Sequence, residues 1–195
     1  MQGHQYCVAL ALVVGLSGVC CSQAQEPPAK LEPKTQLETF LSKKGTILVK
    51  VFHSLGTLSG TVGTSAELTA LTLYEPGKES VGRRGIKIEV KGGGRLEREH
   101  TSFLDLDEVD ALVRGLDYMA DATSGWAANQ TDYTEMVFST KGDFQVGFYV
   151  SEGQSHPFVA SGTIGAANAF LGPEGLKSLR GMLAQGQNYL QSNSK

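Results

Sequence analysis

Hydrophobic and polar residues alternate along much of the chain with the period of two that is typical of β-strands. The clearest run is 86–91, Ile-Lys-Ile-Glu-Val-Lys, in which three β-branched residues face one way and three charged residues the other. The glycines at 92–94 turn the chain, and 96–103 returns as a charge-rich strand. Similar strand signals occupy 47–52 and 68–74. We therefore expect about four strands in the first half.

The spacing of apolar residues changes to three and four after Asp105. Asp105 fits as an N-cap, Glu108 completes a pair resembling a capping box, and Gly125 suits the end of a helix. The pattern predicts an amphipathic helix whose buried stripe is formed by Leu106, Val109, Leu112, Val113, Leu116, Met119 and Ala120.

The second half repeats this order of strands and then a helix. The segments 133–140 and 144–150 flank a turn at 141–143, which predicts a β-hairpin. A weaker strand at 158–161 leads to a final helix over 173–190. We expect three or four strands here.

The two predicted helices also resemble each other. Glu108 is followed by Val-Arg-Gly-Leu at 113–116, and Glu174 by Leu-Arg-Gly-Met at 179–182, at the same spacing. Coincidence between two amphipathic helices is the alternative to a repeat. We predict an α+β fold of antiparallel sheet packed on two amphipathic helices, a single domain over 37–192. It could consist of two tandem strands-then-helix units, with half-repeats at 45–125 and 131–192.

The N-terminal segment is typical of a secretory signal peptide. Its uncharged apolar run, 8–19, is shorter than the roughly 20 residues that span a bilayer. Ser22 and Ala24 suit the −3 and −1 positions, so we expect cleavage of 1–24 between Ala24 and Gln25. A membrane-associated or buried helix is one alternative. A lipoprotein anchor at Cys20 or Cys21 is another, but its flanks lack the leucine of a lipobox.

Cleavage would remove all three cysteines: Cys7, Cys20 and Cys21. The secreted or periplasmic mature chain would then have no disulfide, thiolate nucleophile or cysteine-ligated metal. It would begin with a Pro-rich tether over 25–36. The 41% hydrophobic content and net charge of −3 are those of an ordinary soluble domain and exclude collagen-like, disordered and multi-pass membrane proteins. No transmembrane helix is expected in the mature chain.

The motifs of common enzyme classes are missing from the mature sequence. It contains no P-loop, no G-x-G-x-x-G before a helix and no G-x-S-x-G elbow. His53, His100 and His156 lack the i, i+4 spacing of zinc ligands, and Ser155 precedes His156 directly, so their side chains point apart. We therefore predict no catalytic, cofactor-binding or metal-binding residues and no cofactor. A site assembled from both halves is the alternative that would make the protein an enzyme.

Acidic residues are densest at the start of the first predicted helix. The run contains Asp105, Asp107, Glu108 and Asp110, and several carboxylates could suit calcium. It lacks the glycine and glutamate spacing of an EF-hand, and acidic residues favour a helix N-terminus. We interpret the run as helix capping.

Basic residues concentrate on the third and fourth predicted strands. They could contact an anion or nucleic acid, and they are Arg83, Arg84, Lys87, Lys91, Arg95 and Arg98. Glu89, Glu97 and Glu99 interleave with them, so a solvated face with cross-strand ion pairs is the favoured interpretation.

The segment between the two halves contains two large aromatic residues. Trp126 and Tyr133 bracket it and either stack on a ligand or seal the core, the second being favoured. Asn129 begins a glycosylation sequon whose use depends on the secretory pathway.

Three segments resemble a family of uncharacterised bacterial exported proteins with no assigned activity. They are 36–45 (Gln-Leu-Glu-Thr-Phe-Leu-Ser-Lys-Lys-Gly), 101–108 (Thr-Ser-Phe-Leu-Asp-Leu-Asp-Glu) and 138–144 (Phe-Ser-Thr-Lys-Gly-Asp-Phe). The tandem strands-then-helix units also loosely resemble the Whirly and PC4-like folds. Those folds bind single-stranded nucleic acid on sheet faces, but the aromatic and basic residues of this chain do not match their motifs residue by residue, so the resemblance implies the architecture alone.

These observations favour an exported, non-catalytic binding or structural accessory protein of the cell envelope or extracellular space. Its expected partner is a protein or another envelope component. A binder of single-stranded nucleic acid using the basic strands is the main alternative, and export would remove it from that partner. An enzyme with a split site is the third.

Overall fold

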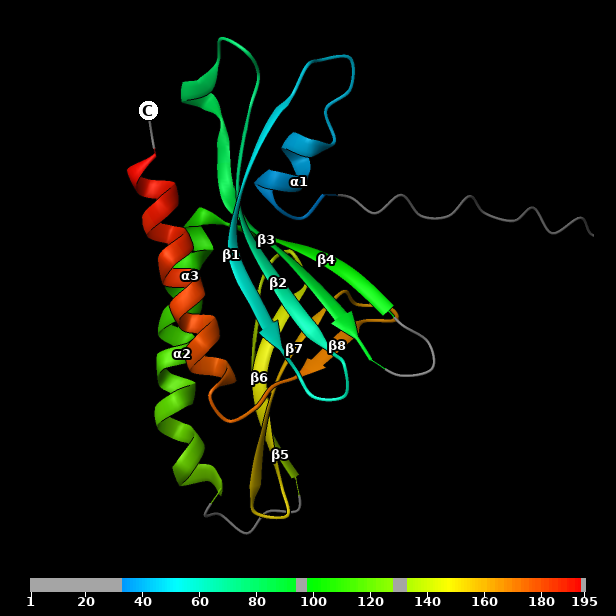
Figure 1. The fold of residues 1–195 in the computed structure, drawn as a ribbon, viewed down its shortest axis with the longest axis vertical. Coiled ribbons are helices and arrows are strands. Elements are labelled where there is room, and N and C mark those ends of the chain that lie inside the picture. The colour runs from blue at the N-terminus through cyan, green and yellow to red at the C-terminus, as the bar shows by residue number, and fades with distance from the viewer. Residues whose placement is uncertain (1–32, 94–97, 128–132, 194–195) are drawn as a thin grey trace, which may run out of the picture. The chain divides into compact units, whose positions relative to one another are not determined.

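Two four-stranded antiparallel sheets, each followed by a long helix, make up the protein in the computed structural model, which describes residues 33–93, 98–127 and 133–193 (Figure 1). Sheet A has the order β1 (Val49–Ser59), β2 (Ser65–Tyr74), β3 (Arg83–Gly92) and β4 (Arg98–Asp105), and is followed by α2 (Leu106–Ala127). Sheet B has the order β5 (Tyr133–Ser139), β6 (Phe144–Ser151), β7 (Gln154–Ser161) and β8 (Ala167–Phe170), and is followed by α3 (Gly175–Ser192). The shorter helices are α1 (Gln36–Leu41) and η1 (Glu79–Val81). The predicted α+β fold with tandem strands-then-helix units is confirmed.

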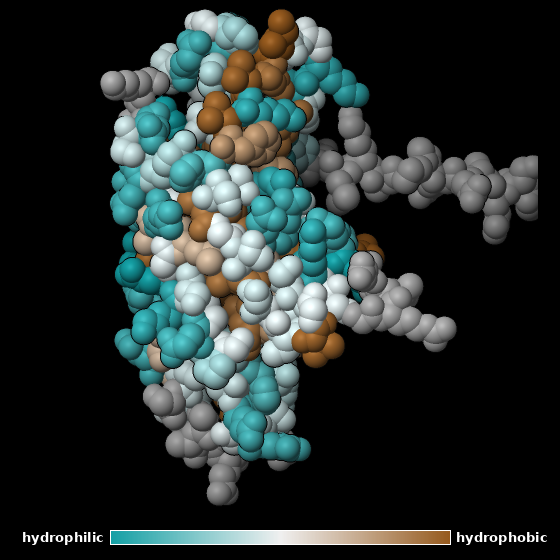
Figure 2. Space-filling model, viewed as in Figure 1, coloured by the Kyte–Doolittle hydropathy of each residue, from teal (hydrophilic) through white to brown (hydrophobic). Residues whose placement is uncertain are grey.

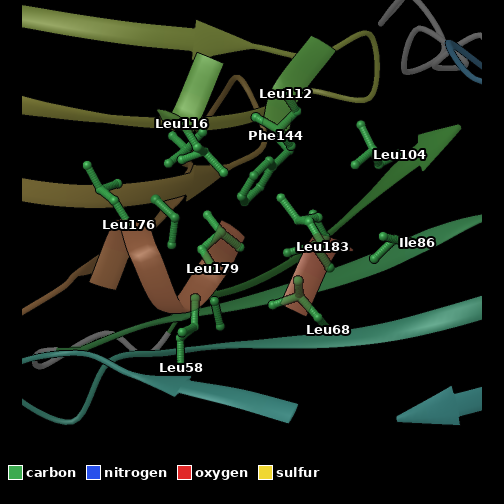
Figure 3. Close-up of a cluster of buried hydrophobic side chains, with 14 of the residues drawn as sticks. Leu58, Leu68, Ile86, Leu104, Leu112, Leu116, Phe144, Leu176, Leu179 and Leu183 are labelled. Atoms are coloured by element: carbon green, nitrogen blue, oxygen red, sulfur yellow. The ribbon is translucent and has the colours of Figure 1, made fainter. Parts of the chain in front are cut away.

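The main core lies between the inner faces of the two sheets and the helices α2 and α3. Side chains from all four layers converge there (Figure 3): Leu68, Ile86 and Leu104 from sheet A, Phe144 from sheet B, and Leu112, Leu116, Leu179 and Leu183 from the helices. The period-two strands supply one apolar face each, and the helices supply one apolar stripe each. Burial of these faces is the dominant stabilising term.

The two sheets also touch directly. Ser102 of β4 and Ser161 of β7, both buried, share a hydrogen bond of 2.7 Å between their hydroxyl oxygens. Gly92 at the end of β3 lies against β8, where an added Cβ would be 3.4 Å from the backbone nitrogen of Asn168. These contacts bring the edge strand β8 beside β3.

Helix α1 packs on the outer face of sheet A and was not expected from the sequence. Leu37 and Phe40 lie on Leu71 and Leu73 of β2 in a second, smaller core. Thr35, expected to belong to the tether, caps this helix: its side chain accepts from the Glu38 backbone N–H, and the Glu38 side chain bonds back to the Thr35 N–H.

Asp105 directly precedes α2, the position expected of an N-cap, but its carboxylate bonds to another helix. Its buried carboxylate accepts hydrogen bonds from the backbone N–H groups of Gln36, at 2.7 Å, and Leu37, at 3.1 Å. It therefore caps α1, an element nearly seventy residues away in the chain. The N–H groups of Gln36 and Leu37 are in the first turn of α1 and have no partner within that helix, so the carboxylate supplies their acceptor.

Several sequence predictions fall outside the described residues. They are the signal peptide 1–24, its cleavage between Ala24 and Gln25, the tether up to residue 32, Arg95 and Asn129. Within the described ranges, no helix combines the length and the apolar character needed to cross a membrane.

Candidate functional site

The outer face of sheet B carries a group of aromatic side chains. In β6, Phe144, Val146, Phe148 and Val150 point into the core, so the intervening residues point outward. The other strands follow the same alternation. The outward aromatic side chains, called the aromatic face below, are Tyr133 of β5, Tyr149 of β6, His156 and Phe158 of β7, and Phe170 of β8.

Tyr149 is the centre of the aromatic face. Its ring stacks on Tyr133 with a centroid separation of 5.7 Å and on His156 with 4.7 Å, and the planes are within 24° in both pairs. Phe158 lies 6.4 Å away in a tilted orientation, and Phe170 is opposite Phe158 in the ladder. The strand register therefore converts residues scattered over 133–170 into one continuous surface.

This surface is open to solvent at its two ends, whereas Phe158 between them is only 9% exposed. Tyr133 is 58% exposed and Phe170 is 43% exposed, far more than core aromatic residues such as Phe144 and Phe148. A shallow cavity of about 420 Å³ lies over the face. Its rim adds the side chains of Glu135, Gln145 and Asn168 to the rings.

The polar groups around the cavity are mostly neutral. Of the described residues that line it, Glu135 is the one charged side chain, and neither Lys nor Arg is present. The Tyr133 hydroxyl donates to Glu135 at 3.1 Å. Partial desolvation, and then this hydrogen bond, raise the pKa of Tyr133, so its phenol stays a donor at neutral pH. The face can thus stack on a flat ring and exchange hydrogen bonds around its edge.

The predicted basic residues are spread over three parts of the fold. Lys87 and Lys91 lie on the outer face of sheet A, where their ammonium groups pair with Glu89 at 2.6 Å and Glu99 at 3.7 Å. The other described members lie at opposite ends of β3 and β4. Arg83 and Arg84 line a cleft that also contains Asp105 and Asp107, whereas Arg98 lines a cavity near Gly92 and Asn168. The described residues do not form one continuous cationic face.

The acidic run is used to connect elements. Carboxylate oxygens of Asp105, Asp107 and Glu108 lie within 4.8 Å of one another, but Asp105 caps α1 and Glu108 accepts from the Lys141 backbone N–H at 3.0 Å. Asp110 accepts from the Gln187 side chain at 2.6 Å, which joins α2 to α3. The described contacts of these acidic residues therefore join neighbouring elements of the fold.

The remaining candidate residues are separated. His53 stacks on Tyr189 at 3.9 Å, His100 lies beside Gly162, and His156 belongs to the aromatic face. Trp126 packs edge-on against the core residue Phe148 at 6.2 Å, so of the two bracketing aromatic residues Tyr133 alone lies on an open surface.

Sequence reasoning missed three members of the aromatic face: Tyr149, Phe158 and Phe170. The alternation of 144–150 puts Tyr149 on the opposite side of its strand from Phe144, Val146 and Phe148, but nothing local marks Tyr149 as part of a site. Phe158 and Phe170 join Tyr149 only through strand pairing.

No known protein-family model matches the chain, and no curated protein is significantly similar to it.

Proposed function

We propose that this chain is an exported, non-catalytic protein that binds an uncharged saccharide on the aromatic face of sheet B. The observation that carries the proposal is the open set of stacked rings around Tyr149, rimmed by neutral polar side chains. Export is supported by the sequence of residues 1–24, which suits a cleaved signal peptide.

The chemistry of the face matches the two sides of a sugar ring. A pyranose has a flat apolar C–H side that packs on aromatic rings, and a perimeter of hydroxyl groups that both donate and accept hydrogen bonds. Tyr149 and Phe170 offer the apolar surface, whereas Glu135, Gln145 and Asn168 offer acceptors and donors at its edge. A few polar groups around an apolar floor are the usual composition of a ligand site.

Charge argues against nucleic acid as the ligand. Bases also stack on aromatic side chains, but the phosphates that connect them require Lys or Arg along the groove. The described lining has instead the carboxylate of Glu135. Of the predicted basic residues, the described members lie on sheet A or near the ends of its strands.

The test is a titration of the processed chain, from Gln25 onward, with soluble hexaoses of glucose, N-acetylglucosamine, mannose and galactose. Binding is measured from the changes in backbone amide chemical shifts by NMR. We expect one class to shift the amides of β5 to β8 and Tyr149→Ala to weaken its binding at least about tenfold, as for a central interface residue. Tyr118→Ala is the matched control, because Tyr118 is 64% exposed on α2, away from the aromatic face. The saccharide affinity of this variant should stay within about twofold of that of the unaltered protein.

Two results would reject the proposal. One is the absence of any shift with all four hexaoses at millimolar concentration. The other is equal affinity of Tyr149→Ala and the unaltered protein, with circular dichroism showing that both are folded. Binding of single-stranded oligonucleotides that weakens steeply with salt would replace the saccharide with nucleic acid.

A further inference from the structure

The outer edge of sheet A offers a second interaction surface, formed by residues 47–53, which lead into β1 and form the first part of its pairing with β2. We propose that β1 pairs antiparallel with β1 of a second copy of this chain, so that two copies of sheet A join into one continuous eight-stranded sheet. This inference does not depend on the proposed function, because the aromatic face is on the other sheet.

The backbone of β1 has a free side. In the described sheet, β1 lies at one end of the order and pairs with β2 alone. An edge strand presents a row of unpaired N–H and C=O groups to any strand that can reach it. Helix α3 covers the inner face of β1 from Leu55 onward, where Gly56 faces Met182 and Leu55 faces Gly186. The last stacking contact toward the start of the strand is His53 on Tyr189.

The side chains of this segment are unusually apolar for an exposed edge. Ile47 is 74% exposed, Val51 is 40% exposed and Phe52 is 56% exposed. Figure 2 shows hydrophobic surface gathered at this end of the molecule, over the start of β1 and the β2–β3 connection, where Val81 is also exposed. Edge strands are normally protected by charged residues, proline or a bulge. Here the bulge lies beyond the segment, between Ser54 and Gly56.

The side chains suit a copy of the same strand. Lys50 and Phe52 pair with Leu73 and Leu71 of β2 and so share the outer face, whereas Val51 between them points to the inner face. A two-fold axis through Val51 places Lys50 opposite the partner's Phe52 on both sides of the axis. A lysine over an aromatic ring is favourable, and Phe52 already has the Lys87 ammonium 6.0 Å from its ring centre.

The same axis avoids the unfavourable pairing of like charges. It places Val51 opposite the partner's Val51, which is an apolar cross-strand pair of two β-branched residues. The arrangement is isologous, since each copy gives and receives the same contacts, and it closes after two copies. It also covers the backbone of both edges.

The first test is sedimentation velocity of the processed chain from about 5 to about 200 µM, because dimerisation follows mass action. We expect the unaltered chain to form a dimer and Val51→Lys to be monomeric, since two lysines would face each other across the axis. Thr57→Lys is the matched control on the same strand beyond the bulge, and it should dimerise normally.

A single introduced cysteine provides a second, independent test. The processed chain lacks cysteine, so Val51→Cys carries a single thiol. In the proposed dimer the Cα atoms of the two cysteines would lie roughly 4.4–6.8 Å apart, the distance that a disulfide requires. Thr57→Cys is the control, because its copies would lie twelve residues apart along the strands, about 40 Å. A monomer at all concentrations, a dimeric Val51→Lys, or equal rates of disulfide formation for the two cysteine variants would each overturn the proposal.

Discussion

Removal of the Asp105 carboxylate should detach α1 from sheet A. Asp105 is 3% exposed, and its carboxylate accepts hydrogen bonds from the first two N–H groups of α1. In Asp105→Ala these two donors lose a charged acceptor, and the N–H of Leu37 loses it in a buried position. Leu37 and Phe40 would then lose their fixed position over Leu71 and Leu73.

The size of the effect follows from these contacts. A hydrogen bond to a charged group contributes about 1.5–3 kcal/mol, so two would contribute about 3–6 kcal/mol. If α1 undocks, the unpaired N–H groups can bond to water, and the six helical residues regain conformational freedom. Both effects limit the loss in the free energy of unfolding. We expect a loss of about 3 kcal/mol in the free energy of unfolding. For a chain of this size the melting temperature would fall by about 6–12 °C. Asp105→Asn, which keeps one acceptor, should lose about half as much.

Urea denaturation and amide hydrogen exchange check this prediction together. The unfolding free energy should fall for Asp105→Ala, and the amides of Gln36 and Leu37 should exchange faster than those of β2. Asp107→Ala is the control, because Asp107 is exposed and its contact with Lys141 is a surface ion pair of 3.5 Å, worth at most about 1 kcal/mol. Equal stability of the two variants, with protected Gln36 and Leu37 amides in both, would refute the capping role.

Three further predictions concern packing and charge. Leu179→Ala, which empties a fully buried position, should lower the unfolding free energy by about 2–5 kcal/mol, measured in urea. Hydrogen bonds from Lys43 and Lys78 lower the pKa of Glu75 from 4.5 to about 2. Its stabilising contribution is therefore present above pH 4.5 and lost as the pH falls toward about 2, so Glu75→Gln should show a weaker acid dependence of its melting temperature. Ser102→Ala, which leaves its serine partner in β7 buried and unpaired, should cost about 1–3 kcal/mol by thermal denaturation, and replacement of both serines by alanine should cost less than the sum of the single changes.

The strands and long helices were predictable where one side of an element is buried and the other is exposed to solvent. The alternation at 86–91 lies within β3, and the change to a spacing of three and four marks α2. Helix α1 was not found, because six residues do not establish a period. Its one local signal was Thr35 followed three residues later by Glu38, the pattern of a capping box.

The candidate site depends on information that a single sequence does not contain. Tyr149 meets His156 because β6 and β7 pair in one particular register, and a shift by one residue would turn the two rings to opposite faces. The role of Asp105 is likewise unpredictable from its neighbours, since its partners come from the start of the domain. Local pattern identified the elements, whereas the site and the capping of α1 arise from their pairing.

The capping of α1 by Asp105 also has a consequence for the order of events during synthesis. Chains emerge from the ribosome N-terminus first, and α1 therefore leaves before the strands that it packs against. Its docking requires Leu71 and Leu73 of β2 and the end of β4, so the earliest described helix is fixed only after nearly seventy further residues have appeared. Until then Leu37 and Phe40 remain exposed to solvent. Docking of α1 is therefore a late step that requires both β2 and the end of β4 to be in place.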